Sequence, residues 1–125
     1  MRDKLASQLS DLGSALDRLD DVLRQPFDEY IRDSAIQRFE FTFELFWKTL
    51  KTRCAIDGIV VHSPRESLRG AFSLGLVEDD GRALAMLEDR NRTSHTYNVE
   101  TAKDIYSRLE DHARLMRETK GRIDP

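Results

Sequence analysis

The sequence predicts an all-α protein, an antiparallel four-helix up-and-down bundle with one additional short helix. Two observations support this fold class. Apolar residues recur at steps of three and four along most of the 125 residues. The composition, 39% hydrophobic and 34% charged with only three prolines, suits amphipathic helices with charged outer faces. Strand-like alternation is confined to residues 59–61, which is too short for a sheet, and no linker divides the chain. We therefore expect one domain.

The first helix is expected over residues 3–24. Its apolar stripe consists of leucines three or four residues apart: Leu5, Leu9, Leu12, Leu16 and Leu19. Gln25-Pro26 ends it, because the residue before a proline is biased away from helical geometry.

A second helix is expected from Asp33, a competent N-cap, to just before Gly58, after a connection over residues 27–33. Half of the ten aromatic residues lie between Phe39 and Trp47, so this helix should be central. Its two sides are both apolar, because Phe41 and Leu45 point nearly opposite to Phe43 and Leu50. Either neighbours cover the helix all round, or the Phe41/Leu45 strip faces a second subunit.

The remaining elements follow from their caps. Ser63-Pro64-Arg65-Glu66 is a capping box that opens a short helix ending before Gly75. A fourth helix resumes near Ala83 and runs into residues 90–95. Asn98 can cap a last helix that closes at Gly121.

Composition also limits the function. The net charge of −3 argues against a generally basic nucleic-acid binder but leaves room for a local basic patch. The single cysteine, Cys54, excludes an internal disulfide and a Cys-rich zinc site, and we expect it to be a buried structural thiol. No apolar run approaches the roughly 20 residues that span a bilayer, and the N-terminus lacks an apolar signal segment. We expect a cytoplasmic protein without a membrane partner.

Residues 89–98, which we call the polar segment, contain no aliphatic residue although the fourth helix should still face the core there. Its arginines can bind phosphate oxygens through a fixed fork of donors. His95 can remove and return protons near neutrality, Asn91 can hold a ligand hydroxyl, and Tyr97 can stack on a base. A polar helix end that turns into a capped loop would also explain part of the pattern.

The geometry of an ideal helix separates Arg90 from His95 by about 140°. The two side chains can converge only if the helix breaks near residues 94–97 or if a second subunit completes the site. Glu40, Glu44 and Lys48 share one flank of the second helix, where they form either an exposed ion-pair row or, for Glu44, part of a cleft near His95. His62 and His112 have no partners at metal-ligand spacing, so we assign them no role.

Two blocks of sequence carry a family resemblance that spans nearly the whole chain. Arg90-Asn91, three residues, His95, one residue and Tyr97 resemble the motif of the HEPN superfamily. Residues 33–51 (DSAIQRFEFTFELFWKTLK) resemble the second-helix signature of the nucleotidyltransferase substrate-binding proteins, the HepT-like toxins that pair with minimal nucleotidyltransferases. Residues 63–66 and 104–106 fall in the expected order. The resemblance thus makes residues 1–125 a single HEPN-like helical domain.

The resemblance implies a function for these residues. Arg90 and His95 match the catalytic pair of endoribonucleases that cut RNA without a metal or other cofactor, and nothing in the motif departs from active members. Tyr97 matches the tyrosine that the nucleotidyltransferase partner adenylylates in some pairs. The resemblance also implies a homodimer with the two motifs close together, an arrangement that would use the Phe41/Leu45 strip.

Three functions remain open at this stage. The first is an RNase toxin neutralised by a nucleotidyltransferase encoded beside it, with Asn91, Tyr97 and Glu44 binding substrate. The second is a non-catalytic subunit that presents a substrate or nucleotide to that enzyme, in which Arg90 and His95 only grip phosphate. The third is a structural helical dimer. The intact motif favours the first function, whereas the low basicity favours the second.

Overall fold

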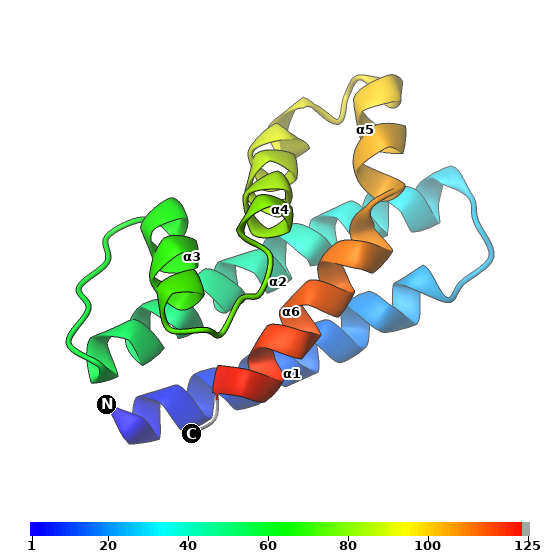
Figure 1. The fold of residues 1–125 in the computed structure, drawn as a ribbon. Coiled ribbons are helices and arrows are strands. Elements are labelled where there is room, and N and C mark those ends of the chain that lie inside the picture. The colour runs from blue at the N-terminus through cyan, green and yellow to red at the C-terminus, as the bar shows by residue number, and fades with distance from the viewer. Residues whose placement is uncertain (124–125) are drawn as a thin grey trace.

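A computed structural model of the protein describes residues 1–123, and every element in that range is a helix (Figure 1). The predicted all-α class is therefore confirmed. The elements are α1 (Arg2–Leu23), α2 (Glu29–Ile56), α3 (Pro64–Ser73), α4 (Asp80–Arg92), the short 3-10 helix η1 (Thr93–His95), α5 (Val99–Tyr106) and α6 (Leu109–Ile123).

Helices α1 and α2 form a long antiparallel pair on which the other helices pack (Figure 1). The backbone oxygen of Arg18 accepts a hydrogen bond from Arg38 Nη1 at 2.7 Å. Near the other end of the pair, Gln8 Nε2 donates to the backbone oxygen of Lys48 at 3.4 Å. Helix α6 runs back along α1, while α3, α4 and α5 pack on α2.

The prediction that the second helix is central is confirmed. Its aromatic side chains Phe39, Phe43 and Phe46 are fully buried. The leucine stripe of α1 packs against the same core. Burying each of these large side chains contributes about 1.5–3 kcal/mol, so this aromatic cluster is a main source of stability.

The predicted start of the second helix at Asp33 is wrong by one turn. Helix α2 begins at Glu29, and Asp28 is its N-cap because its Oδ1 accepts from the backbone N–H of Ile31 at 2.7 Å. Asp33 lies inside the helix, where it accepts from Arg32 Nε at 3.2 Å. Both aspartates can cap a helix, and local sequence does not say which one does.

The last predicted helix, residues 98–121, is interrupted. Asn98 does cap its start, but α5 ends at Tyr106 and α6 begins at Leu109. At the break, Ser107 Oγ donates to the backbone oxygen of Asp104 at 2.6 Å, and Arg108 N–H bonds three residues back, to Ile105. A short polar side chain that bonds its own backbone competes with the regular helix in this way.

The predictions for the start of α3 and for the ends of α2 and α3 are confirmed. Ser63 caps α3, and its Oγ accepts from Glu66 N–H at 3.1 Å. Gly58 and Gly75 follow α2 and α3 with φ of +79° and +76°, the left-handed conformation that favours glycine. No helix within residues 1–123 combines the length and the apolar character that crossing a membrane requires.

Cys54 is buried, as predicted, at a close crossing of α2 and α3. Burial raises the pKa of its thiol above the usual range, which disfavours the reactive thiolate. A Cβ atom added at Gly70 would lie 2.8 Å from Cys54 Sγ, so only glycine allows α3 to approach this closely.

Candidate functional site

The polar segment lies where α4 ends and the chain turns into α5. Helix α4 stops at Arg92, and residues 93–95 tighten into a 3-10 turn. Thr93 Oγ1 donates to the backbone oxygen of Arg90 at 2.7 Å, and Thr96 Oγ1 donates to that of Thr93 at 3.2 Å. The ideal-helix angle between Arg90 and His95 therefore does not apply. Within residues 1–123 these two side chains form no hydrogen bond with each other.

Arg90 is held against α2. Its Nη2 donates to Glu44 Oε1, its guanidinium carbon lies 5.5 Å from the centre of the Phe43 ring, and Nη1 donates to Asn91 Oδ1 at 3.3 Å. The side chain nevertheless keeps 30% of its surface exposed. Because a guanidinium has five N–H donors, the remaining ones are available to a phosphate.

Glu44 joins the predicted site through Arg90. Its other oxygen accepts from Trp47 Nε1 at 3.1 Å, which holds the carboxylate in place. Lys48 Nζ lies 4.0 Å from that same oxygen, so the predicted i, i+4 ion pair with Lys48 is present but long. Glu44 therefore forms part of an ion-pair row and also makes a direct contact with Arg90.

His95 and Tyr97 lie on the surface beyond α4. Their ring centres are 6.1 Å apart in an edge arrangement, and Tyr97 is 84% exposed. Within the described part of the chain, the His95 ring makes no hydrogen bond, so both nitrogens are open to a substrate. Asn91 is exposed as well, at the edge of a hollow of about 310 Å³ that Arg65 and Glu88 also line.

Asp89, the first residue of the polar segment, is buried and has a different role. Only 2% of its surface is exposed. Arg108 donates to both of its oxygens, from Nε and Nη2, at 2.7 Å each. His112 Nε2 lies 2.7 Å from Asp89 Oδ2, and because an ionised carboxylate only accepts, that nitrogen carries the hydrogen. Part of the polar segment is therefore a structural anchor.

The buried carboxylate ties three helices together under the candidate site. Arg92 donates to Asp89 at 3.3 Å and to Asp104 at 2.9 Å, and Arg108 also donates to Asp104 at 2.9 Å. Together with the contact of His112 to Asp89, these contacts join α4, α5 and α6. We call Asp89, Arg108 and His112 the buried triad.

His112, to which the sequence pattern gave no role, has a structural one. His112 is 5% exposed and stacks on Phe39, with ring centres 5.4 Å apart. A signal was present in the sequence, because Asp89 and His112 both occupy core-facing positions, three residues after Met86 and Leu109. A carboxylate and an imidazole that lie on the apolar stripes of two different helices indicate a buried pair.

The electrostatics of the buried triad follow from its contacts. Burial would raise the pKa of Asp89, but the hydrogen bonds and positive charge of Arg108 and His112 outweigh it and lower this pKa to about 2. Asp89 also raises the pKa of Arg108. No three His, Cys, Asp or Glu side chains of residues 1–123 are grouped so that they could hold a metal ion.

Comparison with known proteins places the chain in a family. The family model described as "Nucleotidyltransferase substrate binding protein like" matches residues 7–124. The curated "Probable ribonuclease HepT" of Haemophilus influenzae is 37% identical over 82 residues, or 62% of this chain. The match spans 56% of that relative's length.

Two solved structures share the fold over almost the whole chain. A crystal structure of a Thermus thermophilus protein has a TM-score of 0.86 and 40% identity, covering 91% of this chain and 99% of its own. A Haemophilus influenzae structure, described as revealing the fold of a substrate binding domain of a nucleotidyltransferase, has a TM-score of 0.73 and 26% identity, covering 98% of each chain. Because the family model matches nearly all of the sequence, the protein belongs to the nucleotidyltransferase substrate-binding-protein-like family.

Proposed function

We propose that this protein is a metal-independent endoribonuclease of the HEPN type, the toxin of a pair whose antitoxin is a minimal nucleotidyltransferase encoded nearby. One observation carries the proposal. Arg90 is oriented by Glu44 and Phe43 with donors to spare, and it lies near the end of α4, five residues before His95, which is exposed and makes no side-chain hydrogen bond within residues 1–123. The name of the curated Haemophilus influenzae relative supports the same activity.

The proposed reaction uses two groups. His95 takes the proton of a ribose 2′-hydroxyl, whose oxygen attacks the adjacent phosphorus. Arg90 stabilises the negative charge on the phosphorane. The bond from phosphorus to the 5′-oxygen then breaks, and that oxygen is protonated by an imidazolium, so the products are a 2′,3′-cyclic phosphate and a 5′-hydroxyl.

A second candidate function is a non-catalytic subunit that binds the substrate or nucleotide of a nucleotidyltransferase. The description of the similar Haemophilus influenzae structure and the net charge of −3 favour it. In this function Arg90 and Asn91 hold a phosphate and Tyr97 stacks on a base, without bond cleavage.

The deciding experiment treats RNA with the purified protein in the presence of a metal chelator and analyses the ends of the products. New 2′,3′-cyclic phosphate ends, together with growth arrest when the protein is expressed without its partner, are the expected result. Intact RNA, combined with nucleotide binding in calorimetry, would instead establish the second function.

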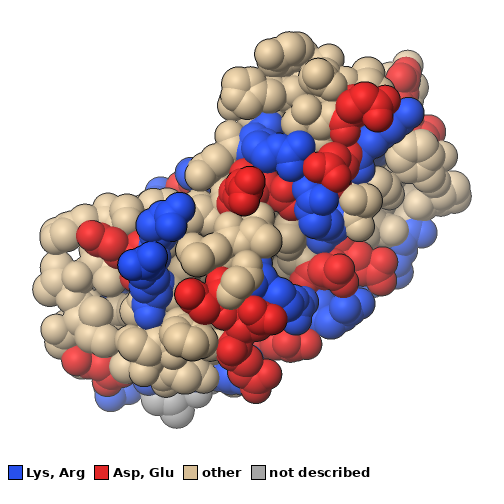
Figure 2. Space-filling view, turned by 45° about the horizontal axis from the view of Figure 1, so that its top comes forward, with Lys and Arg blue, Asp and Glu red and all other residues tan. Residues whose placement is uncertain are grey.

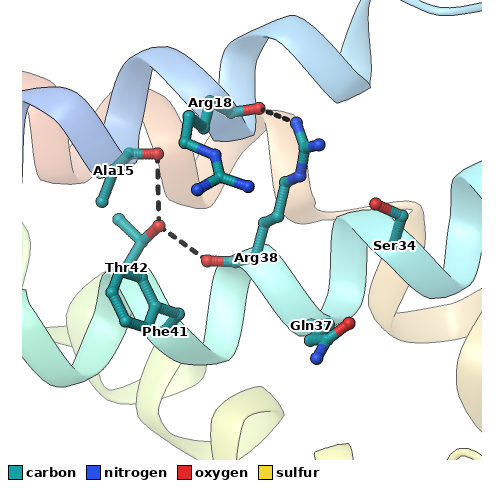
Figure 3. Close-up of a pocket in the computed structure, with 7 residues that line it drawn as sticks. All are labelled: Ala15, Arg18, Ser34, Gln37, Arg38, Phe41 and Thr42. Carbon is teal, nitrogen blue, oxygen red and sulfur yellow. Dashed lines mark hydrogen bonds between the residues drawn. The ribbon is translucent and has the colours of Figure 1, made fainter.

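We also propose a homodimer formed through the exposed face of α2. Phe41 is 61% exposed, a large apolar side chain on the helix that otherwise forms the centre of the core. It lines a hollow of about 410 Å³ together with Arg18 and Arg38 (Figure 3). Leu45, its predicted companion, packs partly against the core of the same subunit.

The dimer gives a testable expectation. Replacing Phe41 with aspartate removes a large apolar side chain from the interface and puts a charge that must be desolvated in its place, so the apparent mass in light scattering is expected to fall from dimer to monomer. Phe72→Asp is the matched control, because Phe72 is 46% exposed on α3 and should leave the dimer intact. If the Phe41→Asp protein stays dimeric, the exposed face of α2 is not the dimer interface.

Tyr97 is the proposed acceptor of the partner's adenylylation. Its hydroxyl is accessible because 84% of the residue is exposed, and its ring lies beside His95. Adenylate attached there would place a bulky anion next to the catalytic groups and block the RNA. After co-expression with the partner, intact-mass spectrometry is expected to show added AMP on the parent and none on Tyr97→Phe. Equal modification of both proteins would exclude Tyr97.

A further inference from the structure

A groove rich in lysine runs between the start of α1 and the C-terminal part of α2. Its volume is about 330 Å³, and its lining includes no acidic residue: Met1, Lys4, Gln8, Lys48, Lys51, Thr52 and Ala55. We call it the lysine groove. The chain has only five lysines, so three of them gather at this one place.

The positive charges of the lysine groove are poorly neutralised. Within residues 1–123, Lys4 and Lys51 form no ion pair, and Lys48 has only Glu44 at 4.0 Å. The face in Figure 2 is different, because basic and acidic side chains alternate across it. Outside the lysine groove, arginines such as Arg92 and Arg108 are paired with aspartates. Ammonium groups gathered without counter-charge repel one another, and a bound polyanion relieves that repulsion.

The lysine groove is linked to the candidate site through the carboxylate of Glu44. Glu44 contacts Arg90 on one side and Lys48 on the other. Glu44, Lys48, Lys51 and Ala55 follow one another at helical steps of three and four, so they form one stripe along α2. From residue 44 to residue 55 this stripe is about 16 Å long. It extends away from the N-terminal half of α2, which carries Phe41 and the hollow around it.

We propose that the lysine groove binds the phosphate backbone of single-stranded RNA whose scissile phosphodiester lies at Arg90. The inference rests on the proposed function and names where the substrate is held. Single-stranded nucleic acids are commonly bound in a positively charged groove that follows the backbone. Gln8, which also lines the groove, donates from Nε2 to the backbone oxygen of Lys48 at 3.4 Å and so joins α1 to α2 there.

The lining favours RNA over an acidic protein as the occupant. Protein interfaces depend on a few buried aromatic or arginine anchors, and the lysine groove offers neither. It offers lysines, an amide and a hydroxyl, which are the groups that contact phosphate and sugar.

The test measures how the affinity for a fluorescent oligouridylate depends on salt, in a His95→Ala background in which RNA cleavage is slowed. The test variant carries Lys4→Gln, Lys48→Gln and Lys51→Gln. Each lost phosphate contact lowers the slope of log affinity against log salt by about 0.7, so the slope is expected to fall by about 2. The control carries Arg24→Gln, Lys103→Gln and Arg114→Gln, which remove the same charge at exposed positions elsewhere and should change the slope little.

Equal slopes and affinities for the test and control variants would overturn the inference. So would a test variant that loses affinity only for the nucleotidyltransferase partner. The two proposals can fail separately. If RNA binding depends on the three lysines but the protein never cuts RNA, the lysine groove is supported as the binding site and the cleavage reaction is excluded. Conversely, a protein that cuts RNA equally well with and without the three lysines retains the reaction and excludes the groove.

Discussion

Replacing His95 with alanine is expected to slow RNA cleavage by about 10²- to 10⁴-fold, the usual contribution of a general acid–base group. Its ring makes no hydrogen bond within the described residues and lies at the surface, so its removal should leave the fold intact. The measurement is the rate of appearance of 2′,3′-cyclic phosphate ends under single-turnover conditions, alongside the midpoint of urea unfolding.

His62→Ala is the matched control for this experiment. His62 is also exposed, but it lies in the connection before α3 and is not part of the polar segment. Cleavage by this control should equal that of the parent. If His95→Ala and the parent cut RNA at the same rate, His95 is not the proton-transfer group, and the proposed mechanism is wrong.

Replacing Asp89 with alanine is expected to destabilise the protein by about 3–5 kcal/mol, because removing one member of a buried ion pair leaves its partners uncompensated. Arg108 would lose both of its short contacts to the carboxylate, and the His112 imidazole would lose its only hydrogen-bond partner among residues 1–123. Urea unfolding followed by circular dichroism measures the loss.

Asp111→Ala is the control for the buried triad. Asp111 accepts from Arg114 at 3.0 Å, but its side chain is 62% exposed. Exposed ion pairs of this kind contribute about 0–1 kcal/mol, so the expected change is small. If the two variants lose the same free energy of unfolding, the burial of Asp89 adds nothing to its contribution to stability.

The same contacts make the stability depend on pH. Because the pKa of Asp89 is about 2 in the folded protein and near 3.8 as a free side chain, its ionised form stabilises the fold at neutral pH. The shift corresponds to about 2 kcal/mol, present above pH 4 and lost as the pH falls towards 2. The difference in unfolding free energy between the parent and Asp89→Asn should therefore narrow below pH 4. A difference that stays constant down to pH 2 would contradict the assigned shift.

Much of the fold could be predicted from the sequence because helix formation and capping depend on neighbouring residues. The leucine spacing of α1, the aromatic run of α2, the Ser63 cap and the glycine after α2 each act over a few positions. Where two nearby residues can each end or begin a helix, local sequence does not say which one does. Asp28 and Asp33 are both competent caps, and the break at Ser107 depends on a hydroxyl that bonds its own backbone.

The candidate site, too, could be predicted only in part. The sequence by itself determined the family, the helical class and the residues with suitable chemistry, Arg90 and His95 among them, because these follow from residue types at fixed spacing. Only the tertiary structure decided that Glu44 contacts Arg90 across 46 positions and that Asp89 is buried against Arg108 and His112. The physical reason is that a polar side chain acts through whatever the packing of helices brings next to it. The polar segment therefore has two parts. Asp89 is a buried carboxylate that holds the helices together, and the residues after it form an exposed candidate site.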